Sequence, residues 1–80
     1  MKIQLLLFGI TKDLMNTSSL NFDVYENTSV LNLKEQLVQA YPQLENISSY
    51  AIAINEEYAT DSTFLKENDV VAIIPPVSGG

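Results

Sequence analysis

The chain contains no cysteine, no histidine and no arginine. Without thiols it cannot form a disulfide, and without thiols and imidazoles it lacks common zinc ligands and common nucleophile–base pairs. Its ten acidic residues outnumber four lysines, for a formal net charge of −6, which is unsuited to binding nucleic-acid phosphates. No apolar run is long enough to span a membrane and no signal peptide is recognisable, so we expect a cytoplasmic location.

The length and the apolar content are those of one small folded domain. Of the 80 residues, 46% are hydrophobic, which argues against intrinsic disorder. A domain of this size buries about 60–65% of the surface of its unfolded chain, enough for a modest core but not for a deep active site as well. No nucleophile–base pair, metal-ligand cluster or phosphate-binding loop is recognisable, so we do not expect an independent enzyme.

Four segments have the alternation or the continuous apolar run of a β-strand: residues 2–8, 19–25, 51–55 and 70–74. A short fifth strand over residues 58–60 is expected to return from the third through a turn at Glu56-Glu57. The two adjacent carboxylates in this turn are expected to face water, and not to bind a metal or act as acid and base. A second turn precedes the last strand, with Asn68 in the left-handed conformation.

One long helix is predicted over residues 30–41, where apolar side chains recur with the helical period. Thr28 or Ser29 is a suitable N-cap, and Pro42 ends the helix. A helical turn is expected over residues 10–15, and a loop with some 3₁₀ helix over residues 43–50. The apolar stripe of the long helix is expected to form the core.

These elements predict an α+β fold of the β-grasp (ubiquitin-like) type, with one main helix packed across a mixed sheet of four to five strands. The first and last strands are apolar on both faces, so we expect them to be buried on both faces and to pair in parallel at the centre of the sheet. Phe8 and Ile74 would then lie at the same end of neighbouring strands. We expect them to form an apolar docking surface, although both residues could simply complete the core.

The predicted domain, residues 1–74, is followed by an extended tail, residues 75–80, that ends in Gly79-Gly80. Pro75-Pro76 stiffens the start of the tail, and the two glycines allow passage through a narrow channel. The terminal carboxylate of Gly80, with a reference pKa of about 3.3–3.7, is unreactive until another protein activates it, for example as an acyl-adenylate. It could then be joined to a lysine or become a nucleophilic thiocarboxylate. A frayed terminus or a cloning remnant is the plain alternative.

The pattern that ends in Asp-Val-Val-Ala-Ile-Ile-Pro-Pro-Val-Ser-Gly-Gly closely resembles the small, sulfur-carrying subunit of molybdopterin synthase, the MoaD family. The likeness covers the whole chain and is most specific over residues 75–80. Two positions depart from the common pattern: Glu56-Glu57 replaces a glycine often present in the hairpin turn, and Asn68 stands where glycine commonly precedes the aspartate. Both departures lie in turns and leave the tail chemistry unaffected.

The resemblance implies a role in molybdenum cofactor biosynthesis. A ubiquitin-activating-type enzyme that uses ATP would adenylate Gly80, and a sulfur donor protein would supply the sulfur of a terminal thiocarboxylate. The tail would enter the large subunit of molybdopterin synthase and give sulfur to cyclic pyranopterin monophosphate. The chain would be the non-catalytic subunit of this sulfurtransferase, bind no cofactor or metal itself, and assemble as two small and two large subunits. The implied groove contacts of the tail are Pro75, Pro76, Val77, Ser78 and Gly79, and the implied apolar contacts with the large subunit are Phe8, Tyr58 and Ile74.

Three alternatives remain open at the level of sequence. A sulfur carrier for thiazole synthesis or tRNA thiolation would share the diglycine and its activation. A ubiquitin-like modifier would be joined to lysines of other proteins. A passive β-grasp interaction domain would have no use for Gly79-Gly80.

Overall fold

The structure is a computed structural model that describes residues 1–76, so the predicted tail residues Val77, Ser78, Gly79 and Gly80 lie outside the described residues. The strands are β1 (Lys2–Leu7), β2 (Ser19–Asp23), β3 (Ala51–Ile54), β4 (Glu57–Ala59) and β5 (Val70–Ile74). The helices are α1 (Ile10–Met15) and α2 (Val30–Ala40), and two 3₁₀ turns follow, η1 (Pro42–Leu44) and η2 (Ile47–Ser49). Every predicted element is present, and the α+β class is confirmed.

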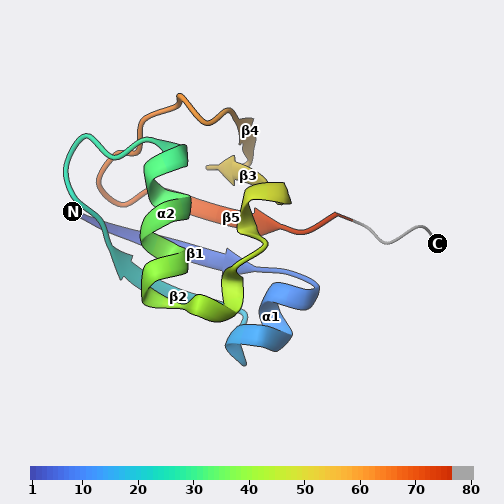
Figure 1. Cartoon of the computed structure of the whole chain (residues 1–80). Coiled ribbons are helices and arrows are strands. Elements are labelled where there is room, and N and C mark those ends of the chain that lie inside the picture. Colours follow the sequence, from blue (N-terminus) through green and yellow to red (C-terminus); the bar gives the residue numbers. More distant parts are fainter. Residues whose placement is uncertain (77–80) are drawn as a thin grey trace.

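The five strands form one mixed sheet in the order β2-β1-β5-β3-β4. The predicted parallel pair at the centre is confirmed, because β1 runs parallel to β5 with Leu7 opposite Ile73. All other neighbours in the sheet are antiparallel. The carboxyl ends of β1 and β5 therefore lie side by side (Figure 1), which is where the predicted tail begins.

Helix α2 lies across one face of the sheet and closes the core (Figure 1). Ser29 is its N-cap, with the hydroxyl oxygen accepting from the Asn32 amide at 3.2 Å, and the helix ends at Ala40 before Pro42. No helix among residues 1–76 is both long and apolar enough to cross a membrane. The largest side chains that are fully buried belong to Ile3, Leu5, Leu7, Leu33, Leu37, Leu44, Ile47 and Ile73.

The opposite face of the sheet is open in the described part of the chain, so the prediction that the central strands are buried on both faces is wrong. Ile3 and Leu5 of β1 are buried under α2, while Gln4 is exposed and Leu6 is half-buried. The reason is that α2 covers only one of the two faces. We call the other face the open face; by register and alternation it includes Leu6, Ala51, Ala53, Tyr58, Val70, Ala72 and Ile74.

The β3–β4 turn is one residue earlier than predicted. Asn55 and Glu56 form it, with φ of 51° and 72°, and Glu57 is already the first residue of β4. A two-residue hairpin needs positive φ at both central positions, and asparagine tolerates that conformation well. The left-handed conformation predicted for Asn68 is confirmed by its φ of 68°.

Candidate functional site: the tail exit and the open face

The predicted tail begins where β5 loses its hydrogen-bonding partners. Strand β5 ends at Ile74, Pro75 is half-buried and Pro76 is exposed. Neither proline has an amide hydrogen, so neither can extend the pairing with β1 or β3. The chain therefore leaves the sheet at Pro75, next to the segment that follows β1.

That segment contains Gly9, which lies directly against Pro75. A Cβ atom placed on Gly9 would be only 3.1 Å from Cγ of Pro75. Gly9 also has φ of 54° and ψ of −132°, a combination that residues with a Cβ rarely adopt. The backbone conformation thus favours glycine here, and a Cβ would be tight against Pro75. The absence of a Cβ lets the loop after β1 pack against the first residue of the tail.

Thr11 fixes the same loop from within. Its side chain is fully buried, and its Oγ1 accepts from the Phe8 amide at 3.0 Å. The Thr11 amide donates to the Phe8 carbonyl at 3.1 Å, and the Lys12 amide donates to the Gly9 carbonyl at 3.1 Å. Phe8 is held by these bonds while its side chain remains 48% exposed. Sequence reasoning missed Gly9 and Thr11 as site residues; the available signal was a glycine between a strand and a helical turn.

The open face presents a row of side chains across four strands. Leu6 of β1 is opposite Ala72 of β5, Ala72 is opposite Ala53 of β3, and Ala53 is opposite Tyr58 of β4. Ile74 of β5 lies opposite Ala51 in the next row of this face. The small alanines between Leu6 and Tyr58 make the middle of the face shallow, with Tyr58 77% exposed at its edge.

The predicted contact residues thus belong to one surface. Continuing the register of Leu7 with Ile73 places Phe8 next to Ile74, at the tail exit. Tyr58 lies on the same face at the β4 edge. An exposed aromatic ring at each side of a shallow apolar surface is typical of a protein-docking site.

A hydrogen-bond network supports the hairpin that carries Tyr58. The Asn55 side chain donates to Asp69 Oδ1 at 2.9 Å and accepts from the Val70 amide at 3.0 Å. The other Asp69 oxygen, Oδ2, accepts from the Lys66 amide at 2.8 Å. Asp69 is buried, so its carboxylate is satisfied by protein donors and not by bulk water. The network ties the β3–β4 turn to the start of β5, a contact that sequence reasoning did not identify.

The described residues provide a surface for binding and no cluster suited to metal binding. Within residues 1–76, no group of three or more histidine, cysteine, aspartate or glutamate side chains could hold a metal ion. Glu56 and Glu57 are exposed at the turn, as expected. Asp61 is paired with Lys34 at 3.0 Å. The reactive group assigned to Gly80 remains a prediction.

Comparison with known proteins gives a consistent family. The ThiS family model matches residues 5–80. The molybdopterin synthase sulfur carrier subunit of Arabidopsis thaliana is 36% identical over 80 residues, which cover 99% of this chain and 83% of that protein. Among solved structures, SAMP1 from Haloferax volcanii has a TM-score of 0.87 and 25% identity, with 100% of both chains covered.

A complex of subunits 1 and 2 of the molybdopterin-converting factor from Helicobacter pylori contains a chain of the same fold. It has a TM-score of 0.69 and 24% identity, again with 100% of both chains covered. The β-grasp fold predicted from the sequence is shared with these neighbours. The family match over residues 5–80 and the identity to the Arabidopsis protein show that this chain belongs to the ThiS family, alongside the molybdopterin synthase sulfur carrier subunits.

Proposed function

We propose that this chain is a sulfur carrier in molybdopterin synthesis, with Gly80 as the residue that holds the sulfur. The observation that carries the proposal is the 36% identity, across nearly the whole chain, to a molybdopterin synthase sulfur carrier subunit. The sequence supports it because the tail that ends in Gly79-Gly80 begins with a stiff diproline, Pro75-Pro76. The chain has neither the thiols nor the imidazoles with which to run the chemistry alone.

The chemistry requires two activation steps by partners. A ubiquitin-activating-type enzyme would join the Gly80 carboxylate to the α-phosphate of ATP, with pyrophosphate leaving. A persulfide on the sulfur donor protein would then attack the acyl carbon and displace AMP, forming an acyl disulfide. A thiol of the donor or of the activating enzyme would reduce that disulfide, ending in a disulfide itself and leaving a thiocarboxylate on Gly80. Transfer of that sulfur to the pterin and addition of water would restore the carboxylate, so each carrier delivers one sulfur atom per cycle.

The partner we propose for the open face is the large catalytic subunit of molybdopterin synthase. Phe8, Tyr58 and Ile74 would be its apolar contacts, because all three lie on one surface that includes the tail exit. Pro75 and Pro76 would enter its groove first, followed by Val77, Ser78 and Gly79. The Helicobacter pylori chain that shares the fold was solved with its subunit 2, which supports the pairing. We propose an assembly of two small and two large subunits.

The test is intact mass spectrometry after incubation with the adenylating enzyme, ATP and a sulfur source. We expect the mass to rise by the difference between sulfur and oxygen, and the rise to disappear when Gly80 is deleted. Addition of the large subunit and cyclic pyranopterin monophosphate should return the original mass. No mass change, with an enzyme that is active on a known carrier, would contradict the proposal.

A ubiquitin-like modifier is the second candidate, and the similarity to SAMP1, a small archaeal modifier protein, favours it. A modifier would use the same adenylate but end in an isopeptide bond to a lysine of another protein. Conjugates of higher mass after activation, absent when Gly79-Gly80 is deleted, would identify it. A carrier for thiazole synthesis or tRNA thiolation would form the thiocarboxylate but would not release its sulfur to the pterin.

A further inference from the structure

A hollow of about 480 Å³ lies beside the tail exit, at the carboxyl end of β1. Its lining includes Leu6, Phe8 and Gly9 on one side, and Lys12, Ser18 and Ser19 on the other. Leu6 is on the open face and lies opposite Ser19, and Gly9 is the residue that lies against Pro75. The hollow therefore adjoins the first residue of the tail, and it combines an apolar wall with one ammonium and two hydroxyl groups.

Lys12 is the one lysine that lies at this end of the described sheet, residues 1–76. Lys34 is already ion-paired, with only 11% of its side chain exposed. Lys2 and Lys66 lie near the starts of β1 and β5, at the opposite end of that parallel pair. Lys12 is exposed and forms no ion pair with any residue of 1–76. Asp13 follows it on α1 but does not line the hollow, and adjacent side chains on a helix do not face each other.

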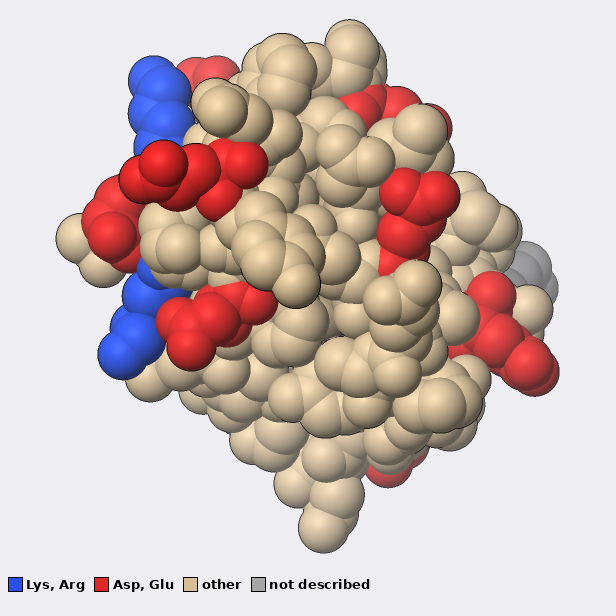
Figure 2. All heavy atoms as spheres, turned by 60° about the vertical axis from the view of Figure 1, so that its left-hand side comes forward, with Lys and Arg blue, Asp and Glu red and all other residues tan. Residues whose placement is uncertain are grey.

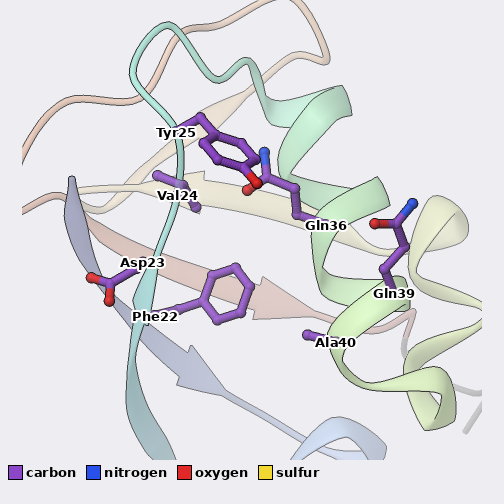
Figure 3. Close-up of a pocket in the computed structure, with 7 residues that line it drawn as sticks. All are labelled: Phe22, Asp23, Val24, Tyr25, Gln36, Gln39 and Ala40. Atoms are coloured by element: carbon purple, nitrogen blue, oxygen red, sulfur yellow. The ribbon is translucent and has the colours of Figure 1, made fainter.

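Other parts of the surface offer little to an anion. Figure 2 turns forward the side on which the N-terminus lies, away from the tail, with acidic side chains spread over it and lysines confined to one margin. The hollow of about 510 Å³ between β2 and α2 has no lysine in its lining. Figure 3 shows the polar groups there, the neutral amides of Gln36 and Gln39 and the carboxylate of Asp23. A carboxylate is therefore attracted to Lys12 more than to these surfaces.

The tail is long enough to bring its terminal carboxylate to this hollow. Four residues, 77–80, follow Pro76 and have a reach of about 13–14 Å when extended. Strand β1 lies between β5 and β2, and neighbouring strands are about 4.7–4.9 Å apart, so the hollow is about 5–10 Å across the sheet from the end of β5. Ser78-Gly79 is a dipeptide typical of turns, which suits a reversal of the chain over the end of β1.

We propose that, before any partner binds, residues 77–80 fold back across the end of β1 and the Gly80 carboxylate binds in this hollow. The carboxylate would pair with the Lys12 ammonium and accept hydrogen bonds from the hydroxyl groups of Ser18 and Ser19. All three donors are on exposed residues, so the contact is weak and reversible.

A partner that takes the tail must first release it from the hollow. The contact therefore lowers the apparent affinity of such a partner in proportion to the fraction of chains that are open. In a sulfur carrier, the hollow would hold the terminal group against its own domain until a partner takes it. The inference does not rest on the proposed function, because the contact needs neither activation nor sulfur and is measured without a partner.

The test treats the purified chain with a carbodiimide, which joins a carboxylate and an ammonium in contact as an amide, with loss of water. We expect digestion and mass spectrometry to find Gly80 joined to Lys12 within one chain. Lys34 joined to Asp61, a pair at 3.0 Å, is the internal positive control. Lys12→Gln should abolish the link to Gly80, whereas Lys66→Gln, the same charge change at the other end of β5, should leave it in place.

NMR separates a bound tail from chance encounters between the tail and Lys12. We expect nuclear Overhauser contacts between Gly80 and the Lys12 side chain, and slower motion of the Gly79 and Gly80 amides than in Lys12→Gln. Lys12→Arg keeps the charge and should keep the slower motion, and added salt should abolish it. Gly80 joined to Lys66 as readily as to Lys12, links formed only between two chains, or equal tail motion in the native chain and Lys12→Gln would each overturn the proposal.

Discussion

Gly9 and Pro75, which are far apart in the sequence, are in contact at the point where the chain leaves the sheet, with Cγ of Pro75 3.1 Å from the position of a Gly9 Cβ. Gly9→Ala should lower the free energy of unfolding by about 1–2 kcal/mol, because φ of 54° is unfavourable for alanine. It should also displace Pro75, and so weaken binding to the large subunit. Denaturant unfolding and calorimetry measure the two effects.

A double-mutant cycle separates the two causes. Pro75→Ala removes Cγ and should relieve the steric part of the Gly9→Ala effect, while the unfavourable φ remains. The two substitutions should therefore be non-additive in the binding free energy. Additive effects would mean that Gly9 does not position Pro75.

Truncation of Tyr58 tests the open face. Tyr58→Ala should weaken binding to the large subunit by about fivefold or more, because aromatic side chains at docking surfaces often contribute over about 1 kcal/mol. The free energy of unfolding should change little, since Tyr58 is 77% exposed. Leu31→Ala is the matched control: Leu31 is 49% exposed on α2, on the other side of the sheet. A stronger effect of Leu31→Ala than of Tyr58→Ala would place the interface on α2.

The strands, the long helix and the central strand pair could be predicted from local periodicity. Which face of the sheet is covered could not, because that depends on whether a second layer of structure packs against it. The apolar faces of the two central strands correctly placed β1 beside β5. The same pattern wrongly implied burial on both faces, because an apolar strand face looks the same whether a helix or a partner protein covers it. Leu6 and Ile74 are half-buried on the uncovered side, which is the face we propose for docking.

Contacts between distant residues explain what sequence reasoning missed in the site. Phe8 and Ile74 were placed together because both follow from strand order. The Gly9–Pro75 contact and the Asn55–Asp69 bond depend on how loops meet, which no local pattern contains. The β3–β4 turn was misplaced by one residue for a related reason: the Asn55 side chain, bonded to Asp69, favours the turn at Asn55 over one at Glu57.

The turn itself gives a stability prediction. Glu56 has φ of 72° without the advantage of being asparagine or glycine. Glu56→Gly should raise the free energy of unfolding by about 0.5–1 kcal/mol, because relief of the left-handed strain exceeds the added entropy of the unfolded chain. Glu57→Gly, one residue later in β4, should lower it by about 0.5–1 kcal/mol. Chemical denaturation measures the change in the free energy of unfolding for each variant. Changes of the same sign in Glu56→Gly and Glu57→Gly would contradict the observed turn position.

The Asn55–Asp69 network should contribute more to the free energy of unfolding than the side chain of Glu56 or Glu57 does. Asn55→Gly introduces a residue that tolerates φ of 51°. It removes the side-chain amide, which donates to Asp69 and accepts from the main-chain amide of Val70. Because the Asp69 carboxylate is buried, losing this donor should lower the free energy of unfolding by about 1–3 kcal/mol. Asn46→Gly is the control, since Asn46 is exposed and its side chain makes no capping bond. The Asn55 variant should also loosen the hairpin, seen as faster hydrogen exchange at the amides of Glu57 and Ala59, which pair with Ile54 and Ile52 of β3, and so weaken binding at the open face. Unchanged stability in Asn55→Gly would show that backbone pairing alone holds β3 and β4 against β5.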